Sequence, residues 1–158
     1  MSHDTLKQLV DRYTVFEMST SVSQKLEYII DPATDVEIEI LRAKASARKL
    51  TLDEDYINFL RIRNGTSYNG LMLYGACILA DDPARRGDIC VMNDYSWNRG
   101  GVTILGTSDL DAYVITRPNG PFQRLDRSCW DVIESYQTCN ELLYSIFEYQ
   151  LEILRCDE

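Results

Sequence analysis

Histidine is nearly missing from this chain of 158 residues, in which His3 is the one example. Because His3 lies in a terminus that we expect to fray, a serine-histidine triad, a histidine general base and a histidine-ligated metal site cannot be built from it. The sequence also lacks a phosphate-cradling glycine loop, and residues 65–70 have the wrong spacing for a serine-nucleophile elbow. Many classes of enzyme are excluded, and we expect a protein that is not an enzyme and holds no cofactor.

Long apolar runs are missing as well. No stretch approaches the roughly 20 apolar residues that cross a bilayer, and residues 1–13 lack the apolar core of a signal peptide. We therefore expect a cytoplasmic protein without a membrane contact. The five cysteines are odd in number and irregularly spaced, which fits neither a disulfide framework nor a metal knuckle. We expect reduced thiols that lie mostly in the core: Cys77, Cys90, Cys129, Cys139 and Cys156.

The chain has fewer basic than acidic residues. The chain has 25 acidic residues against 16 lysines and arginines, a formal net charge of −9. No lysine follows Lys49, and nearly all of the acidic excess lies after residue 50. Such a field repels phosphate backbones and attracts a basic partner, although a charged surface also serves solubility alone. Direct binding to nucleic acid is disfavoured.

Apolar residues at three- and four-residue spacing predict helices at both ends of the chain. Capping-box pairs open several of them, as Thr34 with Glu37, Thr51 with Glu54, and Thr138 with Glu141. Asn64-Gly65 is typical of a left-handed helix end. The predicted helices cover residues 6–16, 21–30, 34–48, 51–63 and 138–154.

Between residues 69 and 133 the pattern changes to short apolar runs bounded by glycine, proline and aspartate, which is typical of strands. Pro118-Asn119-Gly120 has the composition of a hairpin turn. The predicted strands are 71–74, 77–79, 88–92, 101–105, 112–116, 122–125 and 129–133. Segregated helices and strands predict the α+β class: N-terminal helices, a central antiparallel sheet and a long C-terminal helix. We expect one domain over residues 1–158, with 1–30 as an N-terminal helical extension.

Paired carboxylates are the remaining candidates for chemistry. Asp109 and Asp111 would share a sheet face in an extended chain and could hold a hard cation in a metal-dependent enzyme. However, aspartate also favours turns, and Gly106-Thr107-Ser108 precedes this pair, so we favour a turn. Asp81 and Asp82, before Pro83, have the same interpretation.

Large amphipathic rings sit among polar residues at positions 94–98, Asp-Tyr-Ser-Trp-Asn. Tyrosine and tryptophan beside an acid resemble the hot spot of a protein interface aimed at a basic partner. The alternative is that Trp97 covers the edge of the core.

Residues 52–60, Leu-Asp-Glu-Asp-Tyr-Ile-Asn-Phe-Leu, followed by Asn64-Gly65, resemble the signature of the SUKH superfamily. Its usual form is Leu-Pro-x-x-Tyr-x-x-Phe-Leu and then Asn-Gly. Asp53 replaces the usual proline, and both residues suit the first turn of a helix. The resemblance covers about residues 31–152 and is greatest to the YrhA-like branch. The signature itself has a structural meaning, because Tyr56, Phe59 and Leu60 share one helix face.

This resemblance implies an α+β SUKH fold. For bacterial members it implies an immunity protein that binds and neutralises a cognate toxin, often a nuclease, of a polymorphic or contact-dependent toxin system. Eukaryotic and viral members include cell-wall regulators and stress-response proteins, so a cytosolic regulatory binding module without a toxin is the alternative.

The leading hypothesis is inhibition by occlusion of the active site of a basic RNase or DNase. We expect a monomer that forms a 1:1 complex. The predicted toxin contacts come from charge and aromaticity: Asp81, Asp82, Asp94, Tyr95, Trp97, Asp109 and Asp111.

Overall fold

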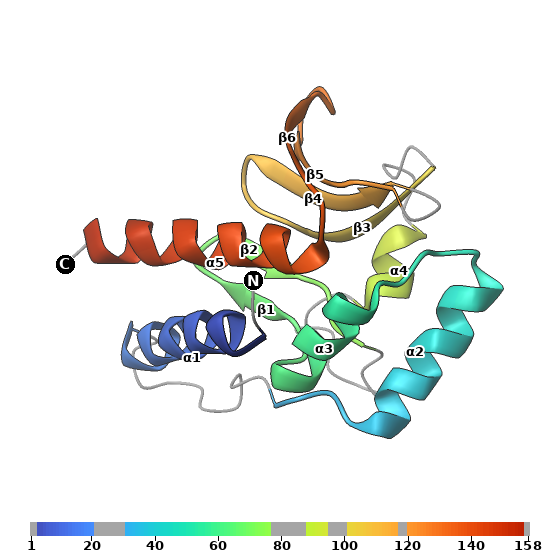
Figure 1. Ribbon diagram of the computed structural model, residues 1–158, viewed down its shortest axis with the longest axis horizontal. Coiled ribbons are helices and arrows are strands. Elements are labelled where there is room, and N and C mark those ends of the chain that lie inside the picture. Colours follow the sequence, from blue (N-terminus) through green and yellow to red (C-terminus); the bar gives the residue numbers. More distant parts are fainter. Residues whose placement is uncertain (1–2, 21–30, 77–87, 95–100, 117–119, 157–158) are drawn as a thin grey trace.

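The computed structural model describes residues 3–20, 31–76, 88–94, 101–116 and 120–156 (Figure 1). The predicted helix at 21–30 and strand at 77–79 lie outside these ranges, as do two residues of the predicted turn, Pro118 and Asn119. The elements are α1 (His3–Thr20), α2 (Asp35–Ala47), α3 (Glu54–Ile62), β1 (Thr66–Tyr68), β2 (Leu71–Leu73), α4 (Ile89–Asn93), β3 (Val102–Thr107), β4 (Asp111–Thr116), β5 (Phe122–Asp126), β6 (Val132–Tyr136) and α5 (Cys139–Cys156).

The six strands form one antiparallel sheet in which each strand pairs with the next in sequence. Asn69 and Gly70, both at positive φ, join β1 to β2, as an Asn-Gly hairpin turn requires. Helices α1 and α5 lie side by side along one side of the sheet, and the β5–β6 hairpin rises away from them (Figure 1). The predicted α+β class, with N-terminal helices and a long C-terminal helix, is confirmed.

Aromatic rings join the helices into the core. The ring of Phe147 on α5 lies 5.2 Å from that of Tyr13 on α1 and 5.7 Å from that of Phe59 on α3, between ring centroids. All three side chains are fully buried. Contacts of this geometry add stabilisation beyond the burial of area. Helix α1 is therefore packed into the same core as the signature helix α3.

The hydroxyl of Tyr56 connects α3 to two strands of the sheet. Its oxygen lies 2.6 Å from the carbonyl oxygen of Tyr74 and 2.9 Å from that of Leu105. The side chain is completely buried, and burial raises the pKa of the phenol well above its ordinary value, so the hydroxyl keeps its proton. It thus satisfies carbonyl groups next to β2 and within β3 that water does not reach.

Close backbone approach explains the Asn-Gly pair of the signature. Gly65 has φ +87°, and a Cβ there would lie 2.5 Å from the carbonyl oxygen of Leu73. The side-chain oxygen of Asn64 accepts a hydrogen bond from the backbone N–H of Ala76 at 2.7 Å. Glycine is therefore required for steric reasons, and the structural interpretation of this part of the signature agrees with the packing.

Two of the predicted capping interactions have the expected side-chain partners. Thr34 and Glu37 form a complete capping box at α2. At α5, the hydroxyl of Thr138 accepts from the backbone N–H of Glu141 at 3.1 Å. At α3 the prediction was wrong by two residues, because Asp53 and not Thr51 is the N-cap. The carboxylate of Asp53 accepts a hydrogen bond from the backbone N–H of Asp55 at 2.9 Å and so caps the first turn of α3.

The predicted strand 88–92 is wrong, since residues 89–93 form α4. Asp88 accepts from the backbone N–H of Cys90 at 2.7 Å and so begins a helix. At the other end, the amide of Asn93 donates to the carbonyl of Ile104 at 2.9 Å and accepts from its N–H at 2.8 Å. The side chain of Asn93 thus bonds the backbone N–H and carbonyl of Ile104 in β3, which a neighbouring strand could otherwise have bonded. The predicted strand 129–133 is also shifted, to Val132–Tyr136.

A buried guanidinium ties α1 to the start of the sheet. Arg63 is 2% exposed and donates to the carbonyl of Gly65 and to the hydroxyls of Thr14 and Thr66. It also forms an ion pair with Glu17 of α1. The planar, always charged guanidinium can serve partners in several directions at once, which a lysine cannot.

None of the helices in the described ranges is long and apolar enough to cross a membrane.

We predict that Tyr56→Phe lowers the free energy of unfolding by about 1–3 kcal/mol, because the buried carbonyl of Tyr74 loses this donor while the ring stays in place. The carbonyl of Leu105 keeps a second donor, the backbone N–H of Tyr74 at 2.8 Å. Urea unfolding followed by circular dichroism measures this change. Tyr149→Phe is the control, since that side chain is 47% exposed. Equal stability of the two variants would contradict the role given to the Tyr56 hydroxyl.

Arg63→Met should cost about 3–5 kcal/mol of unfolding free energy, because it leaves Glu17 charged and nearly buried without its partner. Arg61→Met, which removes an exposed pair with Asp35 at 3.7 Å, should cost no more than about 1 kcal/mol. The double variant Arg63→Met, Glu17→Gln should recover part of the loss. A loss that is the same with and without Glu17→Gln would exclude the ion pair as its cause.

Candidate protein-binding site

Three of the seven predicted contact residues lie in the described ranges: Asp94, Asp109 and Asp111. The other four, Asp81, Asp82, Tyr95 and Trp97, lie outside them. Asp94 ends α4, whereas Asp109 lies in the β3–β4 turn and Asp111 is the first residue of β4. The last two residues have different environments, and they are described separately below.

Asp111 points into the protein. It is 4% exposed, and its carboxylate accepts a hydrogen bond from the guanidinium of Arg124 at 2.9 Å. Arg124 in turn lies over the ring of Tyr149 on α5, with its Cζ 5.7 Å from the ring centroid, which is within the reach of about 6 Å for such contacts. Asp111 thus holds the sheet to α5, and a partner could reach its carboxylate only by opening this ion pair.

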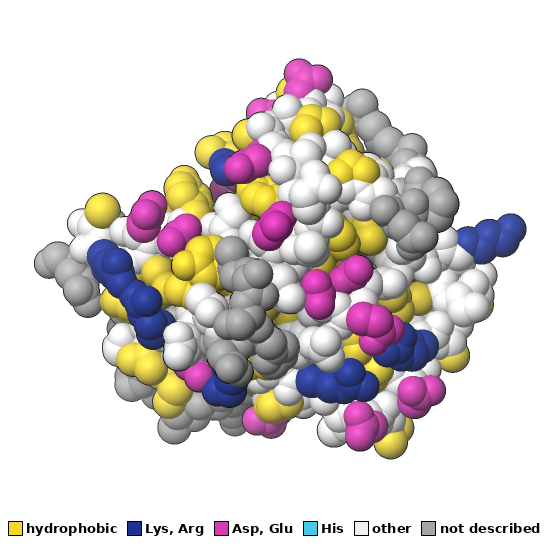
Figure 2. All heavy atoms as spheres, in the orientation of Figure 1, with side chains coloured by type: hydrophobic (Ala, Val, Ile, Leu, Met, Phe, Trp, Pro, Cys, Tyr) yellow, Lys and Arg dark blue, Asp and Glu magenta, His cyan; other side chains and the backbone are white. Residues whose placement is uncertain are grey.

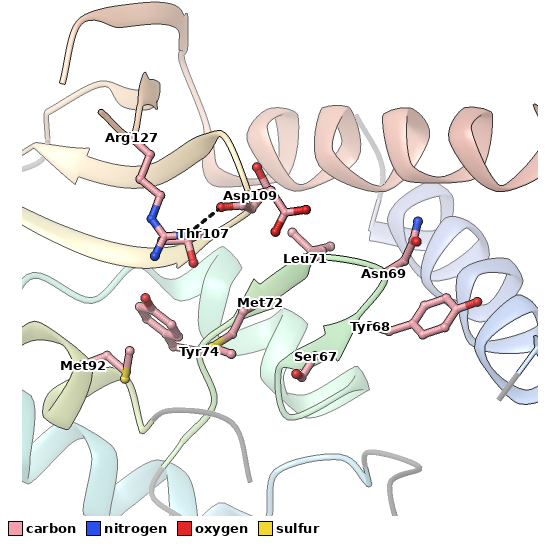
Figure 3. Close-up of a pocket in the computed structure, with 12 residues that line it drawn as sticks. Ser67, Tyr68, Asn69, Leu71, Met72, Tyr74, Met92, Thr107, Asp109 and Arg127 are labelled. Atoms are coloured by element: carbon pink, nitrogen blue, oxygen red, sulfur yellow. Dashed lines mark hydrogen bonds between the residues drawn. The ribbon is translucent and has the colours of Figure 1, made fainter. Parts of the chain in front are cut away.

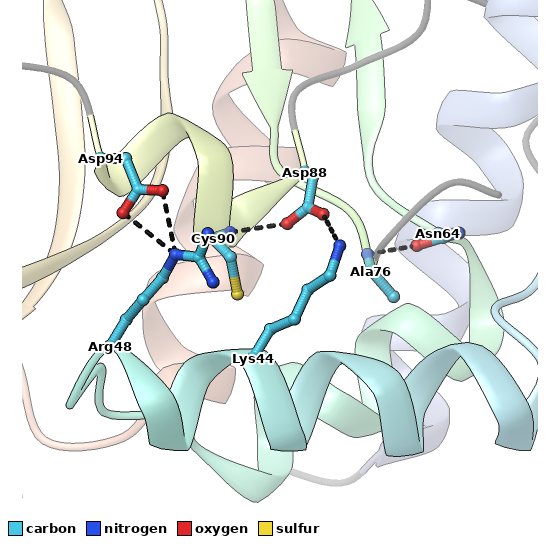
Figure 4. A network of polar contacts seen from close by, with 7 residues as sticks. All are labelled: Lys44, Arg48, Asn64, Ala76, Asp88, Cys90 and Asp94. Atoms are coloured by element: carbon cyan, nitrogen blue, oxygen red, sulfur yellow. Dashed lines mark hydrogen bonds and ion pairs between the residues drawn. The ribbon is translucent and has the colours of Figure 1, made fainter. Parts of the chain in front are cut away.

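Asp94 is already paired within the protein. Both of its carboxylate oxygens lie within 3.0 Å of Nε of Arg48 from α2, and the neighbouring Lys44 contacts Asp88 at 3.2 Å (Figure 4). The hydrogen bond with Asp94 raises the pKa of Arg48 above its ordinary value. The two acids therefore fasten both ends of α4 to α2, although the Asp94 side chain remains 52% exposed.

Asp109 is exposed in the β3–β4 turn, as the turn interpretation predicts. The turn is closed by Ser108, whose backbone N–H donates to the carbonyl of Asp111 at 2.8 Å. In the part of the chain that the structure describes, no three acidic, cysteine or histidine side chains are grouped to hold a metal ion. The Asp109–Asp111 spacing therefore belongs to a turn with one carboxylate outside and one inside.

A cleft of about 430 Å³ lies beside this turn (Figure 3). Ser67, Met72 and Thr107 line it and pair directly across β1, β2 and β3, so their side chains share one sheet face. Tyr74, which follows β2, and Met92 of α4 also line the cleft. Thioether side chains adapt to different shapes, and they occur at surfaces that bind apolar groups.

Two charged side chains line the cleft, and an exposed apolar residue follows one of them in the chain. The charged side chains are those of Asp109 and Arg127 (Figure 3). Leu110, the neighbour of Asp109, is 76% exposed, which is the highest exposure among the large apolar residues described. Arg127 steadies the turn from the opposite hairpin, donating from its backbone to Leu110 at 2.8 Å and from its side chain to the carbonyl of Ser108 at 3.1 Å.

The β5–β6 turn that carries Arg127 is itself held by one carboxylate. A single oxygen of Asp126 accepts from the N–H and hydroxyl of Ser128 and from the N–H of Cys129. These hydrogen bonds lower the pKa of Asp126 to about 2. Trp130 completes the turn at φ +67°, with its N–H bonded to the carbonyl of Asp126. The position of Arg127 is therefore fixed by local hydrogen bonds.

The cysteines described here agree in part with the expected core positions. Cys90 and Cys139 are buried, and burial raises the pKa of both thiols, that of Cys90 to about 11. Both are therefore protonated at neutral pH. Cys129 is exposed in the β5–β6 turn, which corrects its expected place in the core, and Cys156 at the end of α5 is exposed as well. Cys77 lies outside the described residues.

An open cleft lined by thioether, phenol, hydroxyl and amide groups, with the carboxylate of Asp109 in its lining and Leu110 exposed beside it, is suited to binding a side chain of another protein. Sequence reasoning identified Asp109 but missed Leu110, Met72, Met92 and Arg127. The exposure of Leu110 could have been predicted from the sequence, because an apolar residue between two aspartates near a turn is not expected to reach the core. The positions of the two methionines could not have been predicted in this way.

In comparisons with known proteins, no family model matches this chain, and no curated protein matches it.

We expect the carboxyl of Asp126 to titrate at about pH 2 in the folded protein, compared with about 3.9 when unfolded. A pKa lowered by folding contributes stability above the unfolded value, and this contribution is lost as the pH falls from about 4 towards 2. A carboxyl NMR titration measures the pKa, and Ser128→Ala should raise it. An ordinary value in the native protein would contradict the hydrogen bonding described for this turn.

Proposed function

We propose that this protein is an immunity protein of the SUKH type, which binds a cognate toxin domain in the cytoplasm and neutralises it without chemistry of its own. The order of the signature residues from Leu52 to Gly65 supports the family. The net charge of −9 supports a basic partner such as an RNase or DNase. The observation that carries the proposal is the exposed Asp109, which lines a cleft of mixed polar and apolar character, with the exposed Leu110 next to it in the turn.

The mechanism we propose is occlusion. A nuclease cleft is basic because it binds phosphates, and carboxylates placed in it occupy the same electrostatic positions. Acidic side chains gather over α3 and the start of α5 on the face seen in Figure 2. This field would speed association, while Leu110 and the cleft would slow dissociation.

The predicted contact residues have different parts in this proposal. Asp109 faces the toxin directly. Asp94 lies at the rim and would share its charge between Arg48 and the partner. Asp111 does not contact the toxin in this proposal; it supports the turn through its ion pair with Arg124, which joins β4 to β5. The other four remain contacts proposed from sequence alone: Asp81, Asp82, Tyr95 and Trp97.

The protein itself is the bait in the experiment that tests the function, applied to a lysate of the native host at low and then at high salt. Recovery of one stoichiometric basic polypeptide, whose nuclease activity this protein abolishes in a 1:1 complex, would support the immunity role. Low salt preserves the steering charges. Recovery of a kinase, a scaffold or a component of wall synthesis in place of a toxin would favour the regulatory binding module.

We predict that Asp109→Lys slows association with the captured toxin roughly tenfold at low salt, because it reverses a charge at the interface. Leu110→Ala should speed dissociation and cost at least about 1 kcal/mol of binding free energy. Surface plasmon resonance separates the two rates. The matched controls on α2 are Glu39→Lys and Val36→Ala, whose residues are exposed. Equal effects at the control positions would move the interface away from the cleft.

A further inference from the structure

Strand β6 forms one edge of the sheet. It pairs with β5 alone, and no other strand in the described ranges lies on its outer side. Val132 is 54% and Ile133 49% exposed, and the next two side chains are exposed as well. Hydrophobic side chains are visible on this hairpin, which projects above the helices (Figures 1 and 2). A free strand edge with apolar side chains is a template for pairing with another chain.

The conformation of β6 is set before any partner arrives. Its last residue, Tyr136, pairs with Phe122 of β5, and its hydroxyl lies 3.0 Å from that of Ser145 on α5. At its other end, the backbone N–H of Asp126 donates to the carbonyl of Asp131 at 2.9 Å. A β-bulge leaves Ile133 without a partner on β5. A preformed strand avoids the entropy of ordering when it binds.

The charge around this edge selects its occupant. Asp131 and Glu134 are exposed at and beside β6. If two copies of the protein paired antiparallel along all of β6, the strand centre would place one Glu134 opposite the other. Like charges directly opposite one another destabilise a strand pair. A basic strand instead gains from both carboxylates.

We propose that the outer edge of β6 binds an extended, basic segment of a partner protein, which adds to the sheet as a seventh strand. This surface is separate from the cleft beside Asp109. The segment would alternate apolar residues, packing on Val132 and Ile133, with lysine or arginine facing Asp131 and Glu134. Backbone hydrogen bonds supply affinity in this mode of recognition, and the alternate side chains supply specificity.

The probe is a synthetic, end-blocked peptide of alternating valine and lysine or arginine, added to the intact isotopically labelled protein. Amide NMR and hydrogen exchange should show binding and slowed exchange at residues 132–136. A second peptide of the same charge carries proline in place of its central valine. It should bind at least tenfold more weakly, because proline removes a strand donor and breaks the extended pairing.

Charge reversal at the edge provides the second comparison. Asp131→Lys with Glu134→Lys should weaken peptide binding at least tenfold, whereas Glu148→Lys with Glu152→Lys on α5 should change it less than twofold. Both control residues are exposed, so the net charge changes equally. The neutral pair Asp131→Asn with Glu134→Gln keeps the side-chain shapes and should weaken binding by an intermediate amount.

Several outcomes would overturn the inference: equal binding of the proline peptide, equal loss in the α5 control, or no protection of residues 132–136 at millimolar peptide. Shifts at Met72 and Asp109 without shifts on β6 would assign the peptide to the cleft. Protection of β6 without peptide, rising with protein concentration, would identify a second copy as the occupant. No toxin is present, so this result is independent of the lysate experiment.

Discussion

The hydrogen-bonded junction around Tyr56 is the constraint on which the remaining structure depends. Its hydroxyl bonds the carbonyls of Tyr74 and Leu105, so α3 is fixed to β2 and β3 at one point. Gly65 permits the close approach to Leu73 that this contact requires. Strands β2 and β3 carry Met72 and Thr107, which line the cleft. The hydrogen bonds of Tyr56 therefore help to fix the position of these cleft residues. In this way the residues of the signature, which serve packing and hydrogen bonding, help to shape the proposed binding surface.

Most of the acids described in detail here serve the fold, despite the large net charge. Glu17, Asp88, Asp94 and Asp111 each pair with a lysine or arginine, and Asp126 closes a turn. Such acids contribute to the long-range field but are already bonded at short range. Electrostatic steering depends on the whole field, whereas contact energy depends on groups left free to change partners. Asp109, Asp131 and Glu134 are exposed at the proposed surfaces, and of these Glu134 also accepts a hydrogen bond from the hydroxyl of Tyr136 at 2.7 Å.

Periodicity and capping predicted the helices at the two ends well, because Thr34–Glu37 and the apolar face of α5 are local signals. The segment 88–92 was misread because a short apolar run fits a strand as well as a helix turn. Only the tertiary contact of Asn93 with Ile104 decides between them. The cleft could not be predicted either. Met72 and Met92 line the same cleft because α4 packs beside β3, and no periodicity in the sequence indicates which face of the sheet stays open.

The β5–β6 turn links the two proposed binding surfaces mechanically. Arg127 bonds the carbonyls of Ser108 and Leu110 at the cleft, while Asp126 bonds Asp131 at the start of β6. One short segment therefore sets the position of the cleft mouth and of the strand edge. A partner that used both surfaces would find them already in register and would lose little entropy in ordering them. Loosening this turn would then weaken binding at both surfaces, whereas a change at either surface alone would weaken one.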